Sequence, residues 1–208
     1  MASVLFIKAN DRDVEQSTSV KMYETFLKAY KESHPNDEIA ELDLFKVELP
    51  YYGNDAIMAM YKSSQGMELT EAEKAYANLI SSYLDQFLAA DKVVFAFPLW
   101  NFTVPAPLIT YISYLAQAGK TFKYTPEGAV GLVGDKKVAL LSARGGVYSV
   151  EPMLSSEMAH RYVKTILNFF GVNNPAEVII EGHNQFPDKA ADIVSEGLSK
   201  TAELAAKF

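Results

Sequence analysis

The chain has 208 residues, 49% of them hydrophobic, which is enough for one substantial core, so we expect a single domain over residues 1–208. The formal net charge of −7 leaves no basic face for a phosphate backbone, which argues against nucleic acid as a partner. The chain has no cysteine, which excludes disulfides, thiolate chemistry and cysteine-ligated metal.

The first residues do not read as a secretion signal. The apolar run after Ser3 is short, and neither a basic leader nor a small-residue cleavage site accompanies it. No segment reaches the roughly 20 apolar residues that a membrane helix needs. We therefore expect a cytoplasmic protein with no membrane partner.

From this end, short apolar runs alternate with segments of helical periodicity. Such runs predict parallel strands covered on both faces, and apolar residues spaced by three and four predict helices. Thr70 and Glu73 form a capping box that opens a long helix. In chain order we predict a strand at 4–7, a helix at 19–31, a strand at 38–44, the helix that Thr70 opens, a strand at 93–97, a helix at 107–118, a strand at 138–141, a helix at 156–170, a strand at 177–180 and a helix at 188–207. Five strands alternating with five helices indicate an α/β fold, a three-layer sandwich around a parallel sheet.

Two long connections interrupt this alternation, at residues 50–69 and 119–135. Long excursions in a compact domain usually cover a site or meet another subunit. The first is rich in methionine and tyrosine. Its residues, Met60 among them, could form a flexible wall around a planar substrate or could equally well pack in a dimer interface.

Open parallel sheets bind ligands beyond the carboxyl ends of their strands, at the point where the strand order reverses. For a five-stranded sheet of order 2-1-3-4-5, this rule brings together the loops at residues 8–19, 98–105 and 142–152. We expect the ligand site where these three loops meet.

The first of these loops is polar and runs directly into a helix. Asn10, Ser17, Thr18 and Ser19 offer amide and hydroxyl groups beside the free N–H groups of the helix start, which suits a phosphate. The loop has no glycine, so the patterns of dinucleotide and nucleoside triphosphate sites are absent. A serine here could also serve simply as the helix N-cap.

The second loop, PLWNFTVP, is apolar and stiffened by proline. Trp100 and Phe102 flank Asn101, which gives flat apolar surface and one amide for the edge of a heterocycle. These aromatic side chains could equally belong to the core or to a subunit contact.

The third loop contains Gly145 and Gly146, whose N–H groups no side chain would shield from an electron-rich ring edge. Adjacent glycines are also common in plain turns. The meeting of all three loops at one edge favours a ligand, namely a flat heterocycle that carries a single phosphate, as in flavin mononucleotide (FMN).

The motifs KAN with QSTS, PLWNF followed by VP, TFKYTPEG, and ARGG closely resemble those of the FMN-dependent NADH azoreductases, a branch of the flavodoxin-like quinone reductases. The resemblance covers nearly the whole chain. It implies a flavodoxin-like fold and a homodimer with FMN at the subunit interface. It also implies that NADH or NADPH reduces FMN, after which a planar quinone or azo substrate enters the same pocket and takes the electrons.

The resemblance also assigns roles to individual residues. The phosphate and ribityl end would lie on Ser17, Thr18 and Ser19, with Asn10 nearby. The ring would be lined by Leu99, Trp100, Asn101 and Phe102, and its pyrimidine side closed by Ala143, Arg144, Gly145 and Gly146. By the same resemblance Tyr124 would stack near the flavin, from the same subunit or its partner. Tyr124 and Met60 are the candidates for contact with the substrate. Ala9 and Ala143 depart from the family pattern of serine, and we expect each to remove one hydroxyl contact.

Other functions fit the sequence less well. A flavodoxin-like electron carrier would share the phosphate loop but would need an exposed flavin edge, and a module without flavin would leave the polar QSTS loop unexplained. The three histidines lack the spacing of metal ligands, so we expect no metal. We expect His183 to be a solvated loop residue.

Overall fold

The computed structural model, which describes residues 1–208, contains one five-stranded sheet in which every strand runs parallel to its neighbours. The spatial order is β2-β1-β3-β6-β7, which confirms the order predicted from the sequence. The strands are β1 (Ser3–Lys8), β2 (Glu38–Asp43), β3 (Lys92–Pro98), β6 (Lys137–Arg144) and β7 (Ala176–Glu181). The central β3 is buried from Val93 to Pro98, as expected for a strand with a helical layer on each face.

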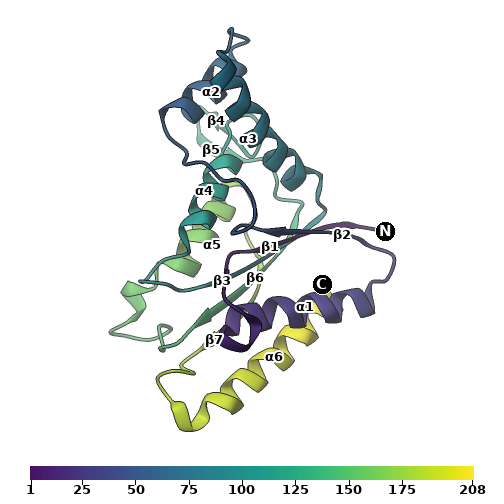
Figure 1. Ribbon diagram of the computed structural model, residues 1–208, viewed down its shortest axis with the longest axis vertical. Helices are drawn as coiled ribbons and strands as arrows, with labels where there is room; N and C mark the ends of the chain where they lie inside the picture. The colour runs from purple at the N-terminus through teal and green to yellow at the C-terminus, as the bar shows by residue number, and fades with distance from the viewer.

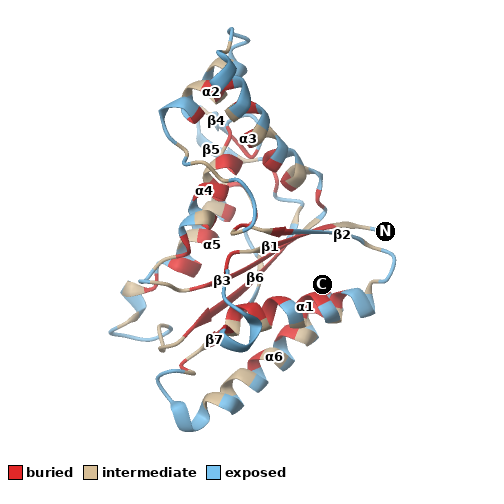
Figure 2. Ribbon diagram, viewed as in Figure 1, coloured by how far each residue is buried: buried red, intermediate tan, exposed pale blue.

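Helices cover both faces of the sheet (Figure 1), so the predicted three-layer sandwich is confirmed. On one face lie α1 (Thr18–Ser33) and α6 (Ala190–Lys207), which pack against each other. On the other lie α3 (Glu71–Ala89), α4 (Ala106–Leu115) and α5 (Ala159–Phe169). Buried residues gather where these helices meet the strands, and their outer faces are exposed (Figure 2).

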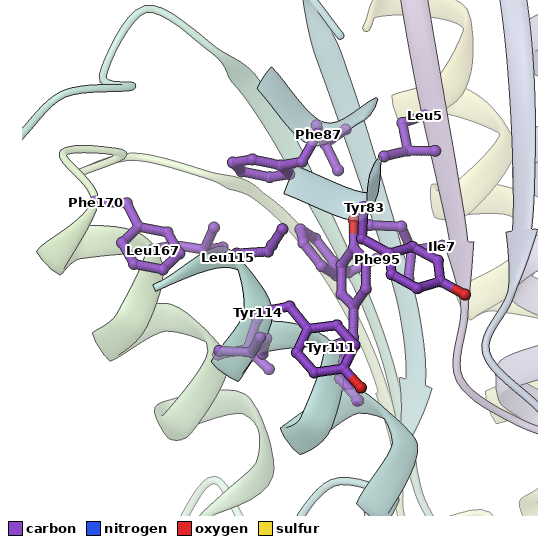
Figure 3. Close-up of a cluster of buried hydrophobic side chains, with 14 of the residues drawn as sticks. Leu5, Ile7, Tyr83, Phe87, Phe95, Tyr111, Tyr114, Leu115, Leu167 and Phe170 are labelled. Atoms are coloured by element: carbon purple, nitrogen blue, oxygen red, sulfur yellow. The ribbon is translucent and has the colours of Figure 1, made fainter. Parts of the chain in front are cut away.

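The larger of the two apolar cores lies between the sheet and the α3–α5 layer. Figure 3 shows Leu5, Ile7 and Phe95 of the strands facing Tyr83 and Tyr111 of the helices. Successive strand residues point to opposite faces, so Phe6 and Val94 enter the second core, under α1 and α6. Apolar burial on both faces fixes the sheet, and with it the positions of the loops at the strand ends.

Local signals set the starts of the two helices that matter most here. Thr70 and Glu73 form the predicted capping box of α3, because the Thr70 hydroxyl accepts from the Glu73 N–H while the Glu73 carboxylate accepts from the Thr70 N–H. Ser17 caps α1, where its hydroxyl accepts from the Val20 N–H. Since Ser17 closes the loop after β1, α1 begins at the carboxyl edge of the sheet.

The two long connections contain secondary structure that the predicted alternation of five strands and five helices did not include. The first contains the helix α2 (Asn54–Ser64), which packs on α3, and the second forms an antiparallel hairpin of β4 (Phe122–Thr125) and β5 (Gly128–Gly131). The chain thus has six α-helices instead of five, with short 3₁₀ turns at Val14–Gln16, Leu154–Ser156 and Pro187–Lys189. None of the helices combines the length and the apolar character that a membrane crossing requires.

Candidate functional site

A cavity of about 470 Å³ lies beyond the carboxyl ends of β1, β3, β6 and β7. Its size is in the range of small-molecule sites. All three predicted loops contribute to it, together with the loop after β7 and the start of α6. The lining residues are Asn10, Arg12, Glu15, Gln16, Ser17, Thr18, Ser19, Lys21, Pro98, Leu99, Trp100, Ala143, Gly145, His183, Asn184, Ala190 and Val194.

Hydroxyl groups held by one amide form the polar end of this cavity. The buried Asn10 donates from Nδ2 to Ser17 Oγ at 2.8 Å and to Ser19 Oγ at 2.9 Å. Its Oδ1 accepts from the Arg12 N–H at 2.9 Å, so the amide is fully engaged. The two serine hydroxyls also lie 3.2 Å apart, so one of them can donate to the other. Because both oxygens accept from Asn10, at least one serine hydrogen remains available to donate to a ligand.

Thr18 and His183 border the same end. The His183 Nε2 lies 3.2 Å from the Thr18 Oγ1, and the His183 Nδ1 is buried without a partner. Burial lowers the pKa of His183 below its ordinary value, and the nearby charge of Lys21 lowers it further. The expectation of a solvated loop residue is therefore wrong, because His183 is half-buried and lines the cavity.

The apolar end is formed by the loop after β3. Leu99 and Trp100 are half-buried in the wall, where the Leu99 N–H donates to the Ala143 carbonyl at 2.9 Å. Trp100 and Thr103 exchange two backbone hydrogen bonds of 2.9 and 3.0 Å, which close a tight turn. At its tip Asn101 and Phe102 both take left-handed backbone conformations, with φ of 48° and 69°. Such strain in residues other than glycine gathers at functional sites.

The glycine loop after β6 presents unused donors. Gly145 lines the cavity, and neither its N–H nor that of Gly146 donates a hydrogen bond within the chain. The carbonyl groups of both are occupied, since Gly145 accepts from the Asn184 and Gln185 N–H groups and Gly146 from that of Gly182. A Cβ at position 145 would lie 2.4 Å from the Asn184 amide nitrogen, so any larger residue there would displace the Asn184 side chain.

Arg144 does not line the cavity. Its buried guanidinium lies between two carboxylates, with Nε 2.9 Å from Glu181 and Nη1 3.6 Å from Glu157. Glu157 in turn accepts from three N–H groups at the start of α5, and Glu181 accepts from the Tyr148 N–H. The Arg144 side chain thus belongs to an ion-pair network at the start of the glycine loop.

The structure brings most of the predicted site residues to the cavity and leaves others outside it. Asn101 and Phe102 are exposed beside it, and Gly146 is next to the lining residue Gly145. Tyr124 on β4 is 74% exposed, and Met60 on α2 packs on the larger core. Sequence reasoning did not select Arg12, Lys21, Asn184 or Val194, and only the position of Arg12 in the first loop and of Lys21 just beyond it could have signalled a role.

Comparisons with known proteins agree with this geometry. Residues 2–204 match the family described as flavodoxin-like fold. An FMN-dependent NADH:quinone oxidoreductase of Brevibacillus brevis is 68% identical, and one of Bacillus cereus is 64% identical, each over 100% of both chains. The crystal structure of an azoreductase from Bacillus anthracis superposes with a TM-score of 0.98 at 60% identity, covering 100% of both chains.

A second solved structure supplies a link to the cofactor. An FMN-dependent NADH-azoreductase from Bacillus anthracis, solved in complex with FMN, is 29% identical, with a TM-score of 0.92 over 100% of this chain and 99% of that one. Full-length identities of 68% and 64% to the curated relatives, together with the TM-score of 0.98 to the azoreductase structure, show the family. The chain belongs to the flavodoxin-like fold family, in its branch of FMN-dependent NADH:quinone oxidoreductases and azoreductases.

Proposed function

We propose that the chain is a two-electron reductase of quinones and azo compounds that holds FMN in the cavity at the carboxyl ends of its strands. The observation that carries this proposal is the division of the cavity into two unlike ends. One end has the oriented hydroxyls at the start of α1, and the other has an indole ring and unpaired backbone N–H groups. A ligand with a single phosphate joined to a flat ring requires both ends, the first for the phosphate and the second for the ring.

The residues present fit FMN. Ser17, Thr18 and Ser19 would hold the phosphate and ribityl chain, because their hydroxyls lie at a helix N-terminus, where the backbone N–H groups also favour an anion. Leu99 and Trp100 would cover the ring and exclude water from it. Asn101 and Phe102 would border the ring from the strained tip of the loop.

When bound, FMN supplies the two-electron redox chemistry, with NADH as donor and a quinone or azo compound as acceptor. The N–H groups of Gly145 and Gly146 would stabilise negative charge at the ring edge that they face, at no cost in reorganisation because the loop is already fixed by Asn184 and Gly182. Arg144 would contribute indirectly, by anchoring the start of this loop.

We further propose a homodimer with the FMN sites at its interface. Four large apolar side chains from the loop after β3 and from the segment between β6 and α5, here called the apolar rim, are 41% to 57% exposed: Phe102, Val150, Leu154 and Met158. The Met158 N–H donates to the Phe102 carbonyl at 3.0 Å, so residues from two separate loops form one surface. Exposed apolar clusters of this kind mark interaction surfaces. Across such an interface Tyr124 and Met60 would approach the substrate, and the proposed location is cytoplasmic.

The test is an anaerobic stopped-flow experiment on the purified protein reconstituted with FMN. We expect NADH to reduce the flavin by two electrons per site, which bleaches its absorbance. A quinone or an azo dye, added after the NADH has been consumed, should restore the absorbance. Parallel runs with NADPH would establish the preferred donor. Failure to bind FMN would overturn the proposal, and slow reduction with accumulation of a stable semiquinone would favour an electron carrier.

A further inference from the structure

One polar side chain at the hydroxyl-rich end of the cavity comes from the opposite end of the chain. His183 follows β7, yet its Nε2 lies 3.2 Å from the hydroxyl of Thr18, the first residue of α1. Thr18 makes no other side-chain hydrogen bond. The pair therefore joins the two elements that border this part of the cavity.

The backbone on either side of His183 is fixed. The Gly182 N–H donates to the carbonyls of Arg144 and Gly146, both at 3.2 Å, and the Asn184 N–H donates to that of Gly145 at 2.9 Å. Gly182 takes the left-handed conformation, with φ of 83°, which lets the chain turn back toward the glycine loop. The imidazole is thus held at a defined place between the glycine loop and α1.

The hydrogen on Nε2 decides what the Thr18 hydroxyl can offer to the cavity. If Nε2 carries the hydrogen, it donates to Thr18 Oγ1, and the threonine hydrogen is free to donate to a ligand. If Nε2 carries no hydrogen, the Thr18 hydroxyl donates to His183 and can offer the ligand only a lone pair. Asn10 creates the first situation for Ser17 and Ser19, whose oxygens accept from its amide.

We propose that His183 is a positioning residue for the phosphate of FMN, and that it makes Thr18 a donor in the way that Asn10 does for the two serines. The inference rests on the proposed function and deepens it, because it assigns His183 to the phosphate end of the site. The inference predicts that loss of His183 weakens the binding of FMN but not that of riboflavin, which has the same ring without the phosphate.

Charge supports the same assignment. The charged groups around His183 in the cavity are Arg12 and Glu15 from the first loop and Lys21 from α1, while α6 contributes only Ala190 and Val194. Burial and Lys21 lower the pKa of His183, so the free ring is neutral at neutral pH. A phosphate dianion nearby would raise that pKa, because an opposite charge favours the protonated ring. Phosphate binding then draws a proton onto His183, and affinity falls as pH rises through the pKa of the complex.

The experiment measures the dissociation constants of FMN and riboflavin from the apoprotein by calorimetry between pH 5.5 and 8.5. Two variants separate the roles of the ring: His183→Gln keeps a donor near the place of Nε2 but cannot titrate, and His183→Leu removes the donor. His34→Gln is the matched control, because His34 stacks on Tyr30, does not line the cavity and belongs to the far end of α1. Thr18→Val, alone and combined with His183→Leu, completes a double-mutant cycle.

For one hydrogen bond to a charged group, we expect His183→Leu to weaken FMN about 10-fold and to leave riboflavin within about twofold. His183→Gln should retain most of the affinity and lose the His183 contribution to its pH dependence. In the Thr18→Val background, His183→Leu should cost clearly less than it does alone, because only the attraction between the charged ring and the phosphate remains to be lost. Equal losses for FMN and riboflavin, unchanged FMN affinity in His183→Leu, or an undiminished loss in the Thr18→Val background would each overturn the inference. Wild-type protein that binds neither ligand would instead overturn the proposed function.

Discussion

Arg144 and Glu181 close neighbouring strands of the sheet, and the Arg144 Nε lies 2.9 Å from the Glu181 carboxylate. The same carboxylate accepts from the Tyr148 N–H at 2.9 Å and from the Ser149 hydroxyl. Glu181 therefore connects the residue before the glycine loop with the residues after it. This single carboxylate holds both ends of the loop that the proposed site requires.

Removal of the Arg144 charge should destabilise the fold and loosen the glycine loop. Arg144→Met leaves the buried Glu157 and the partly buried Glu181 without their cation, and breaking a buried pair in this way costs about 3 kcal/mol. We expect a loss of that size in urea unfolding, together with weaker binding of FMN. Lys200→Met, which removes an exposed pair with Glu196, is the control and should change stability by less than about 0.5 kcal/mol. Equal stability of the two variants would contradict this account of Arg144.

The Glu181 network should also appear in the pH dependence of stability. Burial by itself raises the pKa of Glu181, but hydrogen bonds from Ser149 and Tyr148 and the charge of Arg144 lower it below its ordinary value. A lowered pKa gives stability that is present above the unfolded value and lost as pH falls through the folded value. The stability difference between wild type and Glu181→Gln should therefore be largest near neutral pH and shrink in acid. Urea unfolding at a series of pH values between 7 and 3 measures it, and a constant difference would argue against the linkage.

The sheet and the position of the site follow from local patterns in the sequence. The apolar runs of β1, β3 and β6 identify buried parallel strands, and the rule for open sheets places a ligand where the loops after them meet. Thr70 with Glu73 identifies the start of α3 with equal clarity. Each of these signals lies within one short segment, which is why the sequence alone reveals it.

The features that escaped prediction depend on contacts between distant segments. Nothing near His183 in the sequence indicates Thr18, and nothing near Arg144 indicates Glu157, because the fold alone creates these pairs. The α2 helix was missed for a related reason: within the segment that forms it, only Ala56 and Ala59 become fully buried, so no strong apolar stripe marks it. Its packing on α3, which the Lys62–Glu73 ion pair of 2.6 Å supports, is a tertiary effect.

FMN binding should quench the fluorescence of Trp100. The chain has one tryptophan, and its ring lies in the cavity wall. A flavin that stacks near the indole would accept its excitation energy, so emission should fall in proportion to FMN bound and reach a plateau at one FMN per chain. Free tryptophan with the same FMN concentrations corrects for absorbed light. Emission that follows this control would place the flavin away from Trp100.

The apolar rim should control association of the chains. Met158→Glu adds a charge to an exposed apolar side chain at the start of α5, where an acidic residue suits the helix dipole and should not impair folding. We expect sedimentation velocity to show weaker self-association, with FMN affinity lowered at the same protein concentration. Ser195→Glu adds the same charge to the exposed face of α6, on the opposite side of the sheet, and should leave both properties unchanged. A Met158→Glu protein that associates like wild type would place the interface elsewhere.

Two substitutions of Asn101 separate its amide from its backbone conformation. At φ of 48°, alanine is strained by about 1 kcal/mol relative to asparagine, whereas glycine adopts this conformation freely. Asn101→Ala should therefore lose about 1 kcal/mol of stability and Asn101→Gly less than half of that. Both remove the amide, so both should weaken FMN retention or slow its reduction by NADH. If Asn101→Gly keeps full FMN affinity and normal reduction while Asn101→Ala does not, the strained tip of the loop matters and the amide does not contact the ring.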